Sequence, residues 1–327
     1  MKEIAIWGTG KKCAMWYGWL KRHYKIVCMI DTNCNGDINQ YDGVEIIGIN
    51  RIACFRLNCI VVVTRTKLFE EIIGIAHDAG IPERIIYSLE DFLRNENLIG
   101  DYENETIEKQ LEVIRTILSA SDERINDKKW LLNQICKYGI FCFRNDWKNM
   151  KWMNWNELGL QQIPEEFSDY CTFLSQFRIK EAVEIGVFGG GSAYLQCAIL
   201  LRKNPNLKYT LIDIEDHLNS FERFHNVLPP LERMIPATSK DFQGKCSDLV
   251  FIDADHSYDA VIADYESVGK YANKIITFHD IYAHEYDCEN GGTVRAWNEI
   301  IQKNNNKKVI VFSKYPDQWM GIGCVYS

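Results

Sequence analysis

The sequence predicts an α/β protein with two parallel sheets, one in each half of the chain. Residues 4–20 and residues 181–198 each have the pattern of a buried strand, a glycine-rich turn and a helix. Alternating strand and helix patterns follow both segments, which is typical of a parallel sheet. We therefore expect a smaller domain at residues 1–99, a helical connector at 100–165 and a larger domain at 166–327. The length of 327 residues fits this division, because domains average about 150 residues.

The composition is that of an ordinary globular protein, with 46% hydrophobic and 25% charged residues. The formal net charge is −8, whereas a nucleic-acid-binding protein usually presents a basic surface to the phosphates. The longest apolar runs, such as residues 59–63, have the length of a strand and are too short to cross a membrane. We therefore expect a small-molecule partner, and neither nucleic acid nor a membrane.

The placement of the twelve cysteines indicates thiols rather than disulfides. No two cysteines have the C-x-x-C spacing of a metal site, and several lie inside apolar runs. The chain also begins directly with a strand at residues 4–7, without the basic and apolar regions of a signal peptide. These observations predict a cytoplasmic protein with reduced cysteines.

The first domain carries part of a dinucleotide-binding fingerprint. A strand at residues 4–7 leads into Gly8 and Gly10, and a second strand at 26–30 ends at Asp31, the position that contacts a ribose in such sites. The third glycine position holds Cys13, which would hinder close packing of helix and strand around a pyrophosphate. Glycine is also favoured in tight turns for steric reasons alone.

Further strands are expected at residues 60–63 and 85–87, which would complete this sheet. The segment resembles the small Rossmann-like domains attached to bacterial sugar-modifying and polysaccharide-biosynthesis enzymes. Whether its glycine loop binds a nucleotide, a nucleotide-sugar or nothing stays open.

The segment between the two domains is rich in helix formers. Ile107, Leu111, Ile114 and Leu118 follow a helical spacing, and no strand pattern occurs in residues 101–150. We expect this connector to pack on either domain or across a dimer, so a homo-oligomer is one expected arrangement.

The second domain begins with a longer glycine loop. An apolar strand at residues 181–185 contains Glu184 and leads into Gly186, Gly190 and Ser192, where a helix begins. Glycines let a ligand approach the backbone closely, and the start of a helix offers free N–H groups to a carboxylate. S-adenosylmethionine has such a carboxylate, but the loop alone would suit a nucleotide equally well.

Three later features make the prediction more specific. A strand at residues 209–212 ends at Asp213, whose carboxylate can accept hydrogen bonds from both hydroxyls of a ribose. Thr238 and Ser239 follow at the expected edge of the third strand, where an adenine would lie. A fourth strand ends in a polar cluster at residues 253–258. Ligands of open α/β sheets bind beyond the carboxyl ends of the strands, so these groups are expected to converge.

The ordered set of motifs resembles the class I S-adenosylmethionine-dependent methyltransferases, and within them the macrolide-sugar O-methyltransferases and cephalosporin-hydroxylase-like proteins. The resemblance is carried by residues 184–192, 251–258 and 277–280 and covers about half of the chain. It implies a Rossmann-like fold with a seven-stranded mixed sheet, closed by strands at 308–312 and 321–326. It also implies O-methylation of a sugar, nucleotide-sugar or other small hydroxyl compound.

The resemblance further implies roles for single residues. Asp213 would hold the ribose, while Glu184, Gly186 and Ser192 would shape the site for the methionine part. The complete set of implied cofactor-binding residues is Glu184, Gly186, Gly190, Ser192, Asp213, Thr238, Ser239 and Asp253.

In metal-dependent relatives an acid matching Asp253 and an acidic pair on the next strand hold magnesium, and a histidine matching His256 is the general base. Here the pair is His279 and Asp280, so one carboxylate is missing. Because magnesium prefers oxygen ligands, its binding at Asp253 and Asp280 stays open. An imidazole with an ordinary pKa of about 6.5 can remove a proton from a hydroxyl near neutral pH. His279 is an alternative base, and His256 could instead cap the next helix.

Two other functions are compatible with the sequence. The first is a nicotinamide-dependent oxidoreductase acting through Gly8 and Gly10, although no site for hydride transfer is recognisable. The second is a non-catalytic binding protein that assembles a biosynthetic complex. The polar loop at residues 282–293 is expected to select the substrate, and Arg295 either pairs with an anionic group or is solvated.

Overall fold

The computed structural model describes residues 1–34, 39–64, 68–141, 154–282, 289–315 and 320–327. The chain forms two compact units, which we call unit 1 (Met1–Thr106 with Asn154–Glu157) and unit 2 (Ile107–Met153 with Leu158–Ser327). Each unit contains one β-sheet, of six strands in unit 1 and seven strands in unit 2. The predicted α/β class is therefore confirmed. The segment expected as a connector is divided between the two units, because the boundary lies within the helix α4 (Ile99–Ser119).

The sheet of unit 1 has the strand order β3-β4-β2-β1-β5-β6. Its strands are parallel except β3, which pairs antiparallel with β4. The strands expected at residues 4–7, 26–30, 60–63 and 85–87 correspond to β1, β2, β5 and β6. The elements are β1 (Glu3–Trp7), α1 (Lys11–His23), β2 (Lys25–Ile30), β3 (Asn39–Tyr41), β4 (Val44–Ile47), η1 (Ile49–Cys54), β5 (Ile60–Val62), α2 (Phe69–Asp78), η3 (Glu83–Ile85), β6 (Ile86–Ser88), α3 (Leu89–Asn95) and the start of α4.

The sheet of unit 2 has the order β12-β13-β11-β10-β7-β8-β9. Strands β7 to β11 pair in parallel, and β13 is antiparallel to both of its neighbours, so the predicted seven-stranded mixed sheet is confirmed. The elements are α5 (Asp122–Asn126), α6 (Lys128–Tyr138), α7 (Pro164–Leu174), β7 (Glu181–Ile185), α8 (Gly191–Leu201), β8 (Lys208–Ile212), α9 (Phe221–His225), β9 (Leu231–Met234), η5 (Ser239–Phe242), β10 (Ser247–Ile252), α10 (Tyr258–Ser267), η6 (Gly269–Tyr271), β11 (Ala272–His279), α11 (Gly292–Lys303), β12 (Lys308–Phe312) and β13 (Ile322–Tyr326).

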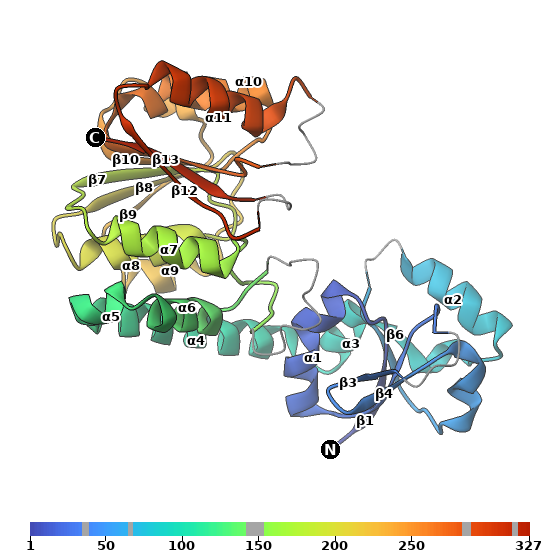
Figure 1. Cartoon of the computed structure of the whole chain (residues 1–327). Helices are drawn as coiled ribbons and strands as arrows, with labels where there is room; N and C mark the ends of the chain where they lie inside the picture. The colour runs from blue at the N-terminus through green and yellow to red at the C-terminus, as the bar shows by residue number, and fades with distance from the viewer. Residues whose placement is uncertain (35–38, 65–67, 142–153, 283–288, 316–319) are drawn as a thin grey trace. The chain divides into compact units, whose positions relative to one another are not determined.

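Helices cover both faces of the unit 2 sheet (Figure 1). Helices α10 and α11 lie on one face, and α7 and α8 lie on the other. All six residues of β10 are buried, as expected for a central parallel strand with helices on both sides. Trp297 of α11 packs directly on β13, where a Cβ on Gly323 would come within 2.7 Å of the indole ring. The sheet and its two helical layers thus fix the strand ends that carry the site.

Two simpler expectations can be compared with this fold. No helix among the described residues combines the length and the apolar character needed to cross a bilayer. The described residues include ten cysteines as thiols, and most of them are buried. Burial raises the pKa of the Cys13 and Cys197 thiols well above the ordinary value, which keeps them protonated and unreactive.

Candidate active site

The glycine loop of unit 2 joins β7 to α8, and its two predicted glycines are sterically required. Gly186 and Gly190 have φ angles of +82° and +85°, which L side chains rarely adopt. A Cβ on Gly186 would lie 2.1 Å from the carbonyl oxygen of Asp253, and one on Gly190 would lie 2.5 Å from the ring of Tyr194. Glycine therefore allows the loop to lie directly against the backbone that follows β10.

Asp213 lies at the carboxyl end of β8, beside this loop. Its Oδ2 accepts hydrogen bonds of 2.9 Å from the backbone N–H groups of Val187 and Phe188, and its Oδ1 accepts one from Glu215. A carboxylate has about four acceptor positions, so Asp213 keeps capacity for further donors. The predicted neighbourhood of loop and carboxylate is thus present among the described residues.

Apolar side chains are exposed next to this carboxylate. Phe188 is 51% exposed and Ile214 is 68% exposed, which is unusual for large apolar side chains in the described part of the chain. The backbone N–H of Ala237 donates to the carbonyl oxygen of Asp213, so the segment after β9 lies here as well. The site therefore offers an apolar surface beside a hydrogen-bonding carboxylate.

Thr238 and Ser239, expected near an adenine, have local structural contacts. Thr238 and Asp241 form a reciprocal capping box at the start of η5, and the backbone N–H of Thr238 donates to Asp241 at 2.8 Å. Ser239 is buried and hydrogen-bonds the carboxyl group of Asp264. The spacing Thr-x-x-Asp is a sequence signal for such a cap.

Glu184, expected at the methionine end of the site, lies in the core beneath the loop. Its side chain is fully buried. Its carboxyl group accepts hydrogen bonds from the hydroxyl of Ser192, from Gln196 at 3.0 Å and from Tyr209 at 2.7 Å. Tyr170 of α7 extends this network by donating to Gln196 at 3.0 Å. Glu184 and Ser192 therefore join β7 to α8 below the loop.

We predict that Glu184→Gln makes the protein more stable at alkaline pH than the natural chain. Burial raises the pKa of Glu184 from 4.5 to about 8, against the hydrogen bonds from Ser192 and Tyr209. The folded state thus retains a proton that the unfolded chain has lost, so the stability contributed by neutral Glu184 declines as the pH rises from about 4.5 to about 8. Glutamine resembles the protonated form and carries no such charge. The difference in free energy of unfolding should grow by up to about 1.36 kcal/mol per pH unit.

Urea denaturation of both proteins at pH 5, 6.5 and 8 would measure this difference. The control is Glu181→Gln at the exposed start of the same strand, which should leave the pH dependence unchanged. Parallel stability curves for Glu184→Gln and the natural chain would show that Glu184 is ionised in the fold.

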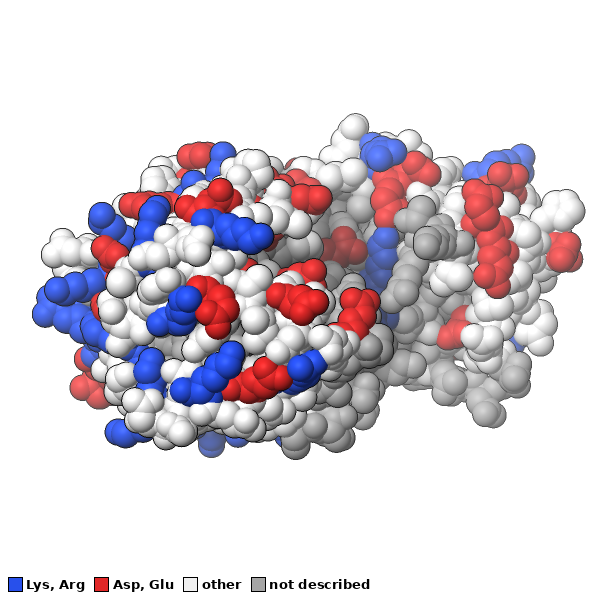
Figure 2. All heavy atoms as spheres, turned by 90° about the horizontal axis from the view of Figure 1, so that it is seen from above, with Lys and Arg blue, Asp and Glu red and all other residues white. Residues whose placement is uncertain are grey.

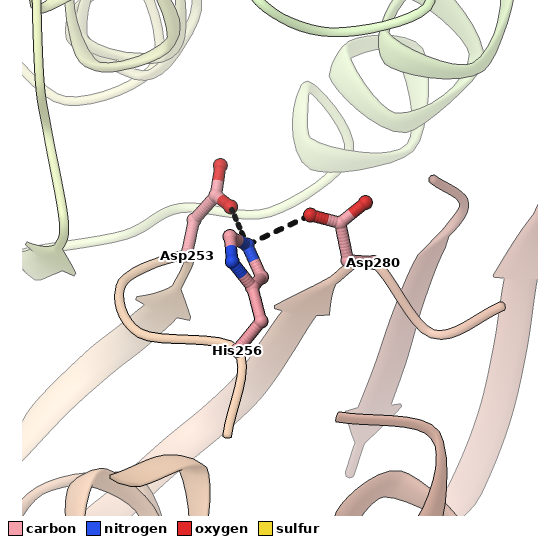
Figure 3. A group of neighbouring side chains, drawn as sticks. All are labelled: Asp253, His256 and Asp280. Atoms are coloured by element: carbon pink, nitrogen blue, oxygen red, sulfur yellow. Dashed lines mark ion pairs between the residues drawn. The ribbon is translucent and has the colours of Figure 1, made fainter. Parts of the chain in front are cut away.

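A second cluster lies at the carboxyl ends of β10 and β11. Figure 3 shows Asp253 and Asp280 at the ends of these neighbouring strands, with the ring of His256 between the two carboxylates. Nε2 of His256 lies 2.8 Å from Oδ2 of Asp280 and 3.7 Å from Oδ1 of Asp253. The predicted catalytic residues are therefore brought together.

His279 and Gln162 complete the cluster. Nδ1 of His279 lies 3.0 Å from Oδ1 of Asp253 and 3.4 Å from Oδ2 of Asp280. Nε2 of Gln162 donates to the other oxygen of Asp253 at 2.7 Å. The sequence did not indicate Gln162, because it lies 91 positions before Asp253 in a segment without a motif.

The cluster has a strong internal charge balance. Burial lowers the pKa of His256, but its contacts with Asp253 and Asp280 outweigh burial and raise this pKa to about 10. The pKa of His279 is raised well above its ordinary value by the same two carboxylates, also against burial. Burial opposes ionisation of Asp253 and Asp280, yet the two histidines hold both carboxyl pKa values well below their ordinary value. The two carboxylates thus require positive charge beside them.

A divalent cation is another source of such charge. One side-chain atom each from Asp253, His256 and Asp280 could act as a ligand, and these three atoms lie within 4.8 Å of one another. Two carboxylates and an imidazole are ordinary ligands for divalent cations. The residues present therefore fit a cation at the position that the sequence suggested.

The glycine loop of unit 1 makes a tight turn between β1 and α1. Gly8 has a φ of +116°, and a Cβ there would lie 2.8 Å from the carbonyl oxygen of Val63. The hydroxyl of Thr9 donates to the carboxylate of Asp31, and Cys13 is buried in the helix that follows. Steric demands of the turn explain Gly8 without a ligand.

The expected substrate loop is only partly within the described residues. Residues 283–288 lie outside them. Arg295 lies over the ring of Tyr258, at 4.0 Å from its centroid, and hydrogen-bonds Glu299 and Asn290. Its guanidinium is therefore engaged within this surface.

Comparison with known proteins gives similar solved structures for about half of the chain. No curated protein sequence matches. A solved O-methyltransferase from Bacillus cereus in complex with SAH is 13% identical, covers 50% of this chain and 82% of its own, and gives a TM-score of 0.41. The O-methyltransferase TomG from Streptomyces achromogenes, in complex with SAM, is 14% identical, with coverages of 53% and 83% and a TM-score of 0.40.

Family models match two separate segments. Residues 1–87 match the family described as C2185-like, N-terminal. Residues 183–281 match the family described as a methyltransferase domain. The second segment includes the glycine loop, Asp213, Asp253, His256 and Asp280, so this family match covers the residues of the candidate site.

Proposed function

We propose that unit 2 transfers a methyl group from S-adenosylmethionine to a hydroxyl oxygen of a small molecule. The observation that carries this proposal is the convergence of two groups of residues along one edge of the sheet. The glycine loop and Asp213 follow β7 and β8, and the cluster of Asp253, His256 and Asp280 follows β10 and β11. A cofactor on the first group would place its reactive end near the second.

The residues around the loop fit this cofactor. Asp213 can accept hydrogen bonds from ribose hydroxyls, and the exposed side chains of Phe188 and Ile214 offer an apolar surface to the adenine ring. The N-terminus of α8, which begins at Gly191, can bind a carboxylate through the N–H groups of its first turn. When bound, S-adenosylmethionine supplies a sulfonium methyl group that an oxygen nucleophile can take.

The cluster of Asp253, His256 and Asp280 supplies the general base. A hydroxyl is a poor nucleophile until its proton is removed, and His256 lies where it can accept that proton. With S-adenosylmethionine bound, the oxygen would bond to the methyl carbon as the carbon–sulfur bond broke, and His256 would hold the proton. Asp280, 2.8 Å from Nε2 of His256, stabilises the resulting imidazolium.

We include a divalent cation in the proposal. It would be held by Asp253 and Asp280 and would supply the positive charge that these carboxylates require. With that charge present, the pKa of His256 would fall from its raised value toward the neutral range, as a base requires. Magnesium would use the carboxylate oxygens, whereas coordination by His256 would favour a transition metal.

We propose a sugar or nucleotide-sugar as the hydroxyl compound. Figure 2 shows Lys and Arg side chains interspersed with Asp and Glu over the face of unit 2 that carries α10 and α11. Such a mixed surface, with the net charge of −8, supports a small acceptor over a nucleic acid.

The experiment is a methyl-transfer assay with the full chain, radiolabelled S-adenosylmethionine and a panel of sugars, nucleotide-sugars and phenols, with and without EDTA. We expect label in one acceptor class and loss of transfer in EDTA. Calorimetric titration with SAH and with NADH accompanies the assay. Binding of NADH alone would favour the oxidoreductase, and binding of neither would favour an assembly role.

We predict that Asp213→Ala weakens SAH binding about tenfold or more, because hydrogen bonds to a charged group contribute roughly 1.5–3 kcal/mol. Calorimetric titration measures the dissociation constant. Glu215→Ala is the control, since Glu215 is an exposed acid two positions away. Equal affinities for both variants would show that Asp213 does not hold the ribose.

A further inference from the structure

Gln162 is a buried polar side chain whose hydrogen bonds are incomplete. It is 2% exposed and lies in the segment before α7. Its Nε2 donates to Oδ2 of Asp253 at 2.7 Å, whereas its Oε1 has no hydrogen-bond partner among the described residues. A buried acceptor without a donor is rare and unfavourable in folded proteins.

The orientation of this amide follows from chemistry. An ionised carboxylate only accepts hydrogen bonds, so the nitrogen of Gln162 must face Asp253. Oδ1 of Asp253 is directed to the ring of His279 at 3.0 Å, on the side of the catalytic cluster. Gln162 therefore donates to the carboxylate oxygen of Asp253 that does not contact His279. The other atom of the same amide, Oε1, is a second acceptor beside Asp253.

The backbone around Gln162 is fixed against the glycine loop. Leu160 forms hydrogen bonds of 2.8 Å with Gly139 and with Phe141. A Cβ on Gly191, the first residue of α8, would lie 3.4 Å from the Cα of Leu160. Gln162 comes two residues after Leu160 and hydrogen-bonds Asp253. Residues 160–162 therefore connect the start of α8 to Asp253.

The two ends of this segment have opposite electrostatic character. The N-terminus of α8 carries a partial positive charge and free N–H groups. Asp253 and Oε1 of Gln162 present acceptors, and Asp253 lies directly against Gly186 of the same loop. A carboxylate at the first end and an ammonium at the second would match a bound amino-acid group.

We propose that Oε1 of Gln162 accepts a hydrogen bond from the α-ammonium group of the cofactor's methionine part. This inference rests on the proposed function and adds a residue that recognises the zwitterionic end of the cofactor. Gln162 also positions Asp253 through its Nε2. The ammonium group supplies the donor that the buried oxygen lacks.

The experiment compares two ligands on the full chain by calorimetric titration. One is SAH, and the other is its analogue with hydrogen in place of the α-amino group. We expect the natural protein to bind SAH about tenfold or more tightly than the analogue, the difference expected for a hydrogen bond to a charged group. Gln162→Met, which keeps the side-chain length, should lose most of this preference by weakening SAH alone.

Gln161→Met is the matched control, because Gln161 is the partly exposed neighbour of Gln162 and undergoes the same chemical change. Equal weakening of both ligands by Gln162→Met, or no weakening, would overturn the inference. If that variant fails to fold, equal binding of the two ligands by the natural protein would also overturn it. Failure of the natural protein to bind either ligand would instead contradict the proposed function itself.

Discussion

Replacing His256 by alanine is expected to lower kcat for methyl transfer by at least about a hundredfold. General acid–base catalysis contributes roughly 10²- to 10⁴-fold, and His256 is one of two imidazoles, with His279, that contact both Asp253 and Asp280. SAH affinity should be nearly unchanged, because the proposed cofactor-binding residues are the glycine loop and Asp213. The labelled-methyl assay measures the first effect, and calorimetric titration measures the second.

The control is His77→Ala, since the His77 side chain is 88% exposed and lies on α2 of unit 1. This variant should retain the turnover of the natural chain. Unchanged turnover in His256→Ala would remove His256 from the reaction and direct attention to His279.

Replacing Gly186 by alanine is expected to lower the free energy of unfolding by about 3 kcal/mol or more. The added Cβ would lie 2.1 Å from the carbonyl oxygen of Asp253 and 2.5 Å from the Cα of Ala254. Both contacts are with backbone, so the loop and the end of β10 would have to separate. SAH binding should be lost with this displacement.

Gly244→Ala separates the steric clash from the backbone conformation. Gly244 also has a positive φ, +75°, but a Cβ there would meet nothing within 4 Å. Its cost should be limited to the left-handed conformation, about 1–2 kcal/mol. Urea denaturation measures both variants, and equal losses would show that the approach to Asp253 is not as close as described.

The sequence predicts best where a long apolar strand meets a polar end. Residues 249–252 are continuously apolar and form most of the central strand β10, which places Asp253 at its carboxyl end. Asp213 follows β8 in the same way. Because parallel strands all end at the same edge of the sheet, their polar ends lie at that edge, as expected for an open α/β sheet.

Contacts between distant segments could not be predicted in this way. Gln162 reaches Asp253 only through the path of the chain before α7. Glu184 faces the core because Gln196 and Tyr209 come from α8 and β8 to meet it. The strands β3 and β4 were not predicted either, because Asn39–Tyr41 contains no aliphatic residue and the apolar residues of Val44–Ile47 are interrupted by Glu45.

The bonds between Asp213 and the amides of Val187 and Phe188 have a consequence for turnover. They hold the Asp213 carboxylate and the glycine loop in a fixed position relative to each other. Binding of the proposed cofactor would therefore not have to order this loop, a cost that would otherwise reduce affinity. In the proposed methyl-transfer cycle, the used cofactor would therefore be exchanged for a fresh molecule without refolding of this loop.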